Sequence, residues 1–152
     1  DAYAFSTEAV IGYTVGRRIK KSFLQTVTNS FQLSIISGLI ISLIYLFTFK
    51  YIINELTDLD YLRFLTFNYI IWIIIIPPVA AICYQFDGIF IGASQTLEMR
   101  NGMIISVFFF ISSSHFLITN FGNHGLWLSL LFFMIMRSIT LNYYFNRILK
   151  KF

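Results

Sequence analysis

Charged residues are scarce in this chain of 152 residues: they make up 12% of it, whereas 57% is hydrophobic and 19% is aromatic. A soluble domain normally has about a quarter charged residues, so this composition does not fit one. The single cysteine, Cys83, excludes an intrachain disulfide, and its place within an apolar run favours simple packing. The lipid bilayer is therefore the expected solvent of the chain.

Motifs for enzymatic chemistry are also missing from the sequence. Its histidines, cysteine and acids form no cluster at metal-ligand spacing, and no glycine-rich phosphate loop ends in Lys-Ser or Lys-Thr. No nucleophile arrangement of the hydrolase type is present either, so we expect neither an enzyme nor a cofactor. The net charge of +4 does not indicate nucleic-acid binding, because the basic residues lie at the ends of apolar runs.

The start of the chain lacks both a methionine and a secretory signal peptide. Residues 1–16 are apolar, but sixteen helical residues reach only about 24 Å of a hydrocarbon core that is roughly 30 Å thick. We interpret them as the truncated tail of a membrane span, and the chain as a fragment or a processed piece of a longer protein.

Four further apolar runs are long enough to cross a bilayer, at residues 23–49, 64–93, 103–119 and 126–145. The pattern predicts an all-α polytopic membrane helix bundle, with four full transmembrane helices plus the end of a fifth, in one domain over residues 1–152. Pro77 and Pro78 predict a kink or a break in the 64–93 run, with the freed carbonyl groups facing protein or water.

The positions of the basic residues predict the orientation. Only Lys50 and Arg63 lie in connections on one side of the membrane, whereas the opposite side collects most of the lysine and arginine, which marks it as cytoplasmic. The predicted location is a multi-pass protein of the cell (inner) membrane with a cytoplasmic C-terminus. The cytoplasmic residues are Arg17, Arg18, Lys20, Lys21, Arg100, Arg147, Lys150 and Lys151.

Three ionisable residues remain inside apolar spans: Glu8, Asp87 and Arg137. At 1.5 Å per residue, all three lie about 10 to 15 Å from the basic side. A charge at the bilayer centre costs about 3 kcal/mol, so we expect a partner or a wet cavity. Our hypothesis is that Glu8 and Asp87 face a central aqueous cleft, where they exchange a proton or hold a cation, and that Arg137 tunes or neutralises one of them. The alternative is a static Asp87–Arg137 ion pair that fixes helix packing.

Two sets of small or polar residues predict helix contacts. Gln25, Asn29 and Gln32 fall at i, i+4 and i+7 on one helical face, which we expect to meet other helices or water and to support a polar cavity together with Arg137. Gly12 and Gly16, four residues apart, could form a close helix-packing face.

Three stretches carry a resemblance to a known family: residues 84–102, residues 2–16, and Asn123-His-Gly-Leu-Trp127. They resemble the C-terminal lobe of the multidrug and toxic compound extrusion (MATE) family, in its DNA-damage-inducible protein F-like branch. The resemblance implies a secondary antiporter of twelve helices in two bundles of six, which exports drugs and organic cations in exchange for protons or sodium. This chain would supply the end of the eighth helix and the ninth to twelfth helices.

The resemblance also implies site residues and partners. Asp87 matches the acid of the family's tenth helix and Glu8 that of the eighth, whereas a cation-linked aspartate of the first helix is not in this chain. The lobe that carries coupling therefore stays open. The implied partners are the lipid bilayer, the missing N-terminal lobe and a small organic substrate, with no nucleic acid and with H⁺ or Na⁺ as the coupling ion. Because alternating access needs two bundles, we expect the chain alone to be inactive.

Two other functions are compatible with the sequence. A lipid-linked oligosaccharide flippase of similar two-lobed build would have a strongly cationic central cavity, whereas this chain offers two acids against Arg137. A membrane interaction protein without transport activity would tolerate neutralisation of Glu8 or Asp87. The antiporter predicts about seven further apolar spans ahead of residue 1.

Overall fold

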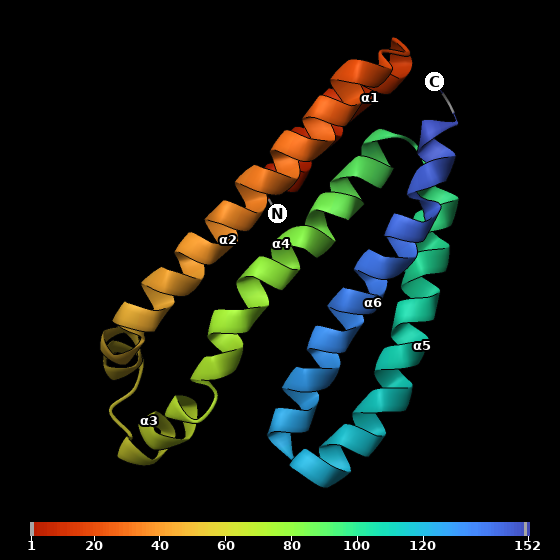
Figure 1. Cartoon of the computed structure of the whole chain (residues 1–152). Coiled ribbons are helices and arrows are strands. Elements are labelled where there is room, and N and C mark those ends of the chain that lie inside the picture. Colours follow the sequence, from red (N-terminus) through yellow and green to blue (C-terminus); the bar gives the residue numbers. More distant parts are fainter. Residues whose placement is uncertain (1, 151) are drawn as a thin grey trace.

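A computed structural model describes residues 2–150 and 152 and consists there of six α-helices (Figure 1). Four of them, α2, α4, α5 and α6, are long and apolar enough to cross a membrane, and α1 is a shorter helix ahead of them. The predicted all-α membrane bundle is therefore confirmed. The helices are α1 (Ala2–Gly16), α2 (Lys20–Leu56), α3 (Asp60–Phe67), α4 (Ile70–Gly92), α5 (Thr96–Phe121) and α6 (Asn123–Leu149).

The predicted 64–93 span is divided, which corrects the sequence prediction. It forms the end of α3 and all of α4, and α2 extends to Leu56, beyond the predicted limit of 49. Arg63 of α3 donates from Nε to the Thr57 carbonyl oxygen at 2.7 Å and from Nη2 to the Asn54 carbonyl oxygen at 3.0 Å. These bonds satisfy carbonyl groups at the end of α2 and fold α3 back against it, so the chain re-enters the bundle only at α4.

The two prolines do not break α4, which is helical through both Pro77 and Pro78. Proline at position 78 has no N–H to offer the Ile74 carbonyl, and the Ser42 hydroxyl of α2 donates to that oxygen instead, at 2.7 Å. Gly38 makes the approach possible, because a Cβ there would lie 3.0 Å from Pro78 Cα. Of the predicted kink or break, the break is therefore wrong, but a carbonyl freed by proline does face a protein donor, as predicted.

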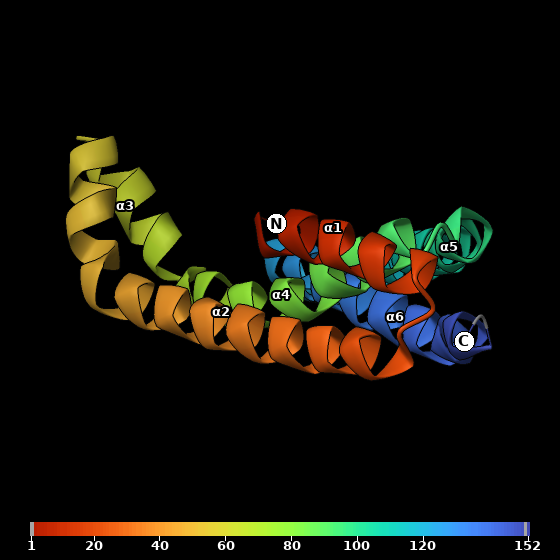
Figure 2. The same ribbon diagram turned by 90° about the horizontal axis from the view of Figure 1, so that it is seen from above.

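The helices form two groups that meet along α4 and α6. Helices α1, α2 and α4 pack together, while α5 and α6 form an antiparallel hairpin beside them (Figures 1 and 2). α1 runs beside only part of α2, so the start of α1 lies partway along the bundle (Figure 2). This placement fits an α1 that is too short to span a bilayer by itself.

Close backbone contact between α1 and α4 depends on Gly88 and Gly92, which are four residues apart on one face of α4. A Cβ on Gly88 would overlap the Ala4 carbonyl oxygen, and a Cβ on Gly92 would lie 2.5 Å from the Glu8 carbonyl oxygen. Of the predicted glycine pair, a Cβ on Gly12 would make only an ordinary 3.5 Å contact, and one on Gly16 would meet nothing within 4 Å. The close packing face is therefore on α4, not on α1.

The buried apolar core lies at one end of the bundle. The α1–α2 turn, the α4–α5 turn and the end of α6 meet there, and we call this end of the bundle the basic end. The Phe23 ring lies 5.9 Å from Phe145 and 5.0 Å from Phe152, measured between centroids, so the C-terminus is packed against the start of α2. These contacts fix the helix ends relative to one another. The core residues are Ile11, Phe23, Phe86, Ile89, Phe90, Ala93, Leu141 and Ile148.

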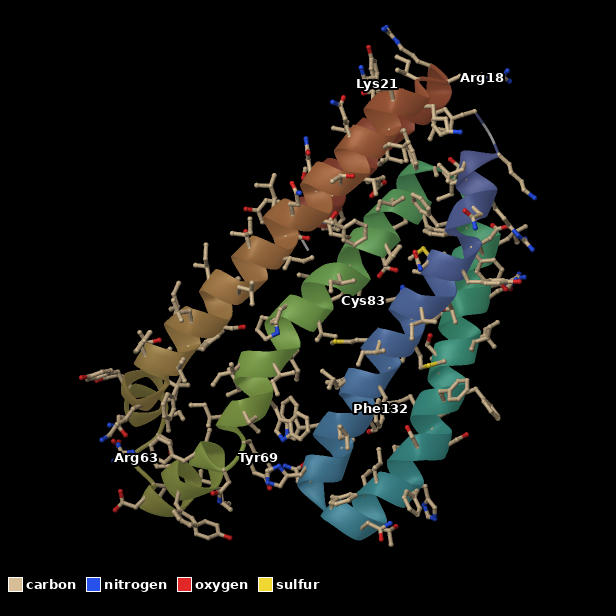
Figure 3. The ribbon with its side chains drawn as sticks, viewed as in Figure 1. Arg18, Lys21, Arg63, Tyr69, Cys83 and Phe132 are labelled. Atoms are coloured by element: carbon tan, nitrogen blue, oxygen red, sulfur yellow. The ribbon has the colours of Figure 1, made fainter. Side chains whose placement is uncertain are left out.

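At the opposite end, α4 and α6 are joined by polar aromatic residues. The Trp72 indole N–H donates to His124 Nδ1 at 2.9 Å, and the His124 ring lies 4.7 Å from the ring of Tyr69, which marks this end in Figure 3. His124 lies in the first turn of α6 and connects that helix to the start of α4.

Candidate transport site

An ion pair between α4 and α6 lies within the membrane-spanning part of the bundle. Arg137 Nη2 lies 2.9 Å from Asp87 Oδ1, and Arg137 Nε donates to the same oxygen at 3.0 Å. Nη1 of the same guanidinium lies 3.1 Å from the Met103 sulfur on α5. The side chains of Arg137 and Asp87 are only 10% and 14% exposed. Arg137 therefore neutralises one of the two predicted acids.

The Asp87–Arg137 pair is less extensive than a full arginine–carboxylate pair. Both nitrogen contacts go to Oδ1, whereas a fork-to-fork arginine–carboxylate pair would engage both oxygens. Removing two charges from water is costly, and their attraction offsets that cost only when the geometry and the remaining hydrogen bonds are good. A pair held through one oxygen is easier to separate than a bidentate one, and loss of the carboxylate charge would remove the ionic attraction and leave only hydrogen bonds to a neutral group.

Glu8 does not share a site with Asp87 in this conformation. Glu8 is half-buried and lines an open groove of about 400 Å³ between α1 and α4, and Asp87 does not line that groove. Successive residues of a helix point about 100° apart, so once Gly88 faces α1, Asp87 turns toward α6. The two acids therefore line no common pocket among the described helices, and a cleft that they share stays a prediction. The groove is lined by Phe5, Glu8, Ala9, Gly12, Tyr13, Ile91 and Gly92.

The three amides of α2 lie away from the ion pair. Gln25, Asn29 and Gln32 are exposed, whereas the buried face of α2 carries small residues such as Ser34 and Gly38 on the opposite side of the helix. The packed helices of the described chain therefore do not cover the amide face. Their part in a polar cavity stays a prediction that requires further protein or water beside α2.

A mainly apolar cavity with several hydroxyl groups at its edge was missed by the sequence reasoning. It has a volume of about 210 Å³, lies between α1, α2 and α4, and borders Pro77. Beside it, the Ser37 hydroxyl donates to the Tyr3 hydroxyl oxygen at 3.1 Å, and the Thr7 hydroxyl donates to Gln85 Oε1 at 3.0 Å. The four-residue spacing of small residues on α2 was the available signal. The lining residues are Tyr3, Ser34, Ser37, Gly38, Ile41, Pro77, Ala80, Ala81, Tyr84 and Gln85.

A second ion pair at the basic end was also missed. Arg147 Nη1 lies 3.0 Å from Glu98 Oε1, which connects the first turn of α5 to the last turn of α6. The Arg147 side chain is 59% exposed, so solvent screening leaves the pair a small contribution to stability. Glu98 is the third residue of α5, where a carboxylate is favoured by the helix N-terminus, and that position was the signal.

One known protein matches the chain over most of its length. The chain is 36% identical over 141 residues to DNA damage-inducible protein F of Escherichia coli (strain K12). The match covers 93% of this chain but 30% of that protein, so the chain spans less than a third of its relative's length. No family model matches the chain, and no solved structure was found to match it.

Proposed function

The chain is a partial-length homologue of a member of the MATE family, and on this premise we propose that it forms part of a secondary antiporter that exports drugs or organic cations in exchange for protons or sodium. The four apolar helices fit a multi-pass membrane protein. In this proposal the missing N-terminal lobe supplies the second bundle for alternating access, and the C-terminus faces the cytoplasm of the inner membrane.

The Asp87–Arg137 pair is the observation that carries the proposal. It links α4 to α6 through two charges inside the membrane. A contact that served only to pack the two helices would cost less free energy if its side chains were apolar. We assign Asp87 the coupling role: its carboxylate releases the Arg137 guanidinium and binds a proton or Na⁺ instead. Because the coupling cation then favours the separated form of the pair over the closed form, its binding shifts the equilibrium between two arrangements of α4 and α6.

Glu8 takes a different role in the proposal, that of the substrate site. Its groove combines one carboxylate with the rings of Phe5 and Tyr13, which is the chemistry that attracts a flat organic cation. The groove is open, so a substrate reaches it without passing the Asp87–Arg137 pair. Substrate binding and cation coupling would thus be assigned to the two sides of α4, and motion of that helix would connect them.

The test is export by the full-length protein in sealed vesicles. A fluorescent organic cation is loaded, and a pH or sodium gradient is imposed across the membrane. The proposal predicts export that follows one of the two gradients and stops when a protonophore or sodium ionophore collapses it. Gradient-independent movement of a lipid-linked oligosaccharide would instead identify a flippase, and no transport of either substrate would favour an interaction protein.

A further inference from the structure

Two basic segments that are far apart in the sequence meet at the basic end. One is the α1–α2 turn with Arg17, Arg18, Lys20 and Lys21, and the other is the end of α6 with Arg147 and Lys150. Figure 3 shows Arg18 and Lys21 at the end of the bundle where Figure 1 places the C-terminus. Glu98 contributes an acid here, but it is already paired with Arg147. The end therefore has a positive excess that the described ion pairs do not neutralise.

A cavity joins the two segments. It has a volume of about 590 Å³ and is lined by Arg18, Lys150, Val15 and Phe152, two cations and two apolar residues. Phe152 also packs on Phe23 with ring centroids 5.0 Å apart, which holds the C-terminus, and with it Lys150, beside the α1–α2 turn. The orientation of a membrane protein requires only positive charge on one side, not a cavity lined by both cations and apolar residues.

The backbone at Arg18 is a second, independent observation. The Arg18 N–H donates to the Val15 carbonyl at 3.1 Å and the Ile19 N–H to the Thr14 carbonyl at 3.0 Å, which is the Schellman motif that ends a helix. Arg18 occupies its left-handed position with φ 55°, where glycine is strongly favoured. The chain thus places an arginine side chain at the cavity at the cost of backbone strain.

We propose that this cavity binds the phosphate group of an anionic phospholipid. Arg18 and Lys150 would donate charge-assisted hydrogen bonds to the phosphate oxygens, and Val15 and Phe152 would contact the acyl chains. The cavity lies where membrane-spanning helices end, which is the level of lipid headgroups. A free phosphate ion has the same charge chemistry but gains nothing from contact with Val15 and Phe152. The inference does not depend on the proposed transport.

The experiment compares two left-handed positions. Full-length protein is purified in detergent, and binding of phosphatidylglycerol and phosphatidylcholine is measured by native mass spectrometry. Arg18→Gly removes one cation and the strain, so it should raise the melting temperature while weakening phosphatidylglycerol binding roughly fivefold. Ser94→Gly is the matched control, because Ser94 has φ 54° in the α4–α5 turn and does not line the cavity. It should raise the melting temperature and leave lipid binding unchanged.

Several results would overturn the proposal. Unchanged phosphatidylglycerol binding in Arg18→Gly would do so, as would equal binding of phosphatidylcholine by the wild-type protein. Full displacement of the lipid by an equal concentration of inorganic phosphate would show a free-anion site instead. If Arg18→Gly does not accumulate, Lys150→Gln replaces an exposed residue after α6 and should weaken phosphatidylglycerol binding similarly, whereas Arg100→Gln, an exposed cation outside the cavity, should not.

Discussion

Asp87→Asn is expected to abolish gradient-driven export by the full-length protein while the protein still accumulates in the membrane. Asparagine keeps an oxygen that can accept from Arg137, whose Nε and Nη2 lie 3.0 and 2.9 Å from Asp87 Oδ1, but it cannot take up a proton or attract Na⁺ as a carboxylate does. Coupling between sites typically corresponds to factors of about 5 to 150, so we expect export to fall by roughly tenfold or more. Vesicle export under an imposed gradient is the measurement.

Variants of Arg137 separate coupling from simple stabilisation. Arg137→Gln leaves the Asp87 carboxylate buried without its cation, and breaking a buried pair in this way costs about 3 to 5 kcal/mol. Asp87→Asn/Arg137→Gln removes both charges and should accumulate better than Arg137→Gln, yet remain uncoupled. If the pair were only a static contact, this double variant would export normally. Wild-type coupled export in Asp87→Asn would remove Asp87 from the mechanism.

Gly88→Ala should destabilise the bundle strongly, because the new Cβ would overlap the Ala4 carbonyl oxygen of α1. Backbone atoms cannot rotate aside as a side chain can, so α1 has to move away from α4. Overpacking typically costs about 1 to 3 kcal/mol, and we expect a value at or above the upper limit. The measurement is the melting temperature of the purified protein in detergent, with size-exclusion chromatography as the readout of unfolding.

Gly16→Ala is the matched control for that prediction. A Cβ on Gly16 would meet nothing within 4 Å, so the same added methyl group should leave the melting temperature unchanged or slightly higher. Displacement of α1 in Gly88→Ala should also disturb the groove that Glu8 lines together with Gly92. Equal melting temperatures for Gly88→Ala and Gly16→Ala would contradict the close α1–α4 contact.

Length and composition were sufficient to predict much of this fold. A membrane-spanning helix needs about twenty apolar residues and makes its backbone hydrogen bonds within itself. The apolar runs therefore predicted four membrane-spanning helices and a shorter one. The pairing of Asp87 with Arg137 was among the predicted alternatives for a similar reason. Two opposite charges at a similar depth in a membrane have few other partners.

The sequence could not determine how each helix is turned about its own axis. Helix α4 is apolar on nearly every side, so no polar face indicates which residues turn toward α1 and which toward α6. This is why Glu8 and Asp87 were assigned to one cleft, and why Gly12 and Gly16 were preferred to Gly88 and Gly92. The break considered at Pro77 and Pro78 is absent for a related reason, since the hydroxyl that compensates for the missing N–H of Pro78, that of Ser42, comes from another helix.

The central claim is that Asp87 separates from Arg137 during transport, and covalent labelling tests it directly. A carbodiimide reacts with a protonated carboxyl group in an apolar site, and mass spectrometry of the labelled wild-type protein locates the adduct. The account predicts labelling of Asp87 that rises while a proton gradient drives export and falls when a protonophore collapses the gradient and export stops. An Asp87 that stays unlabelled under every condition that supports proton-driven export, while the more open Glu8 is labelled, would contradict it.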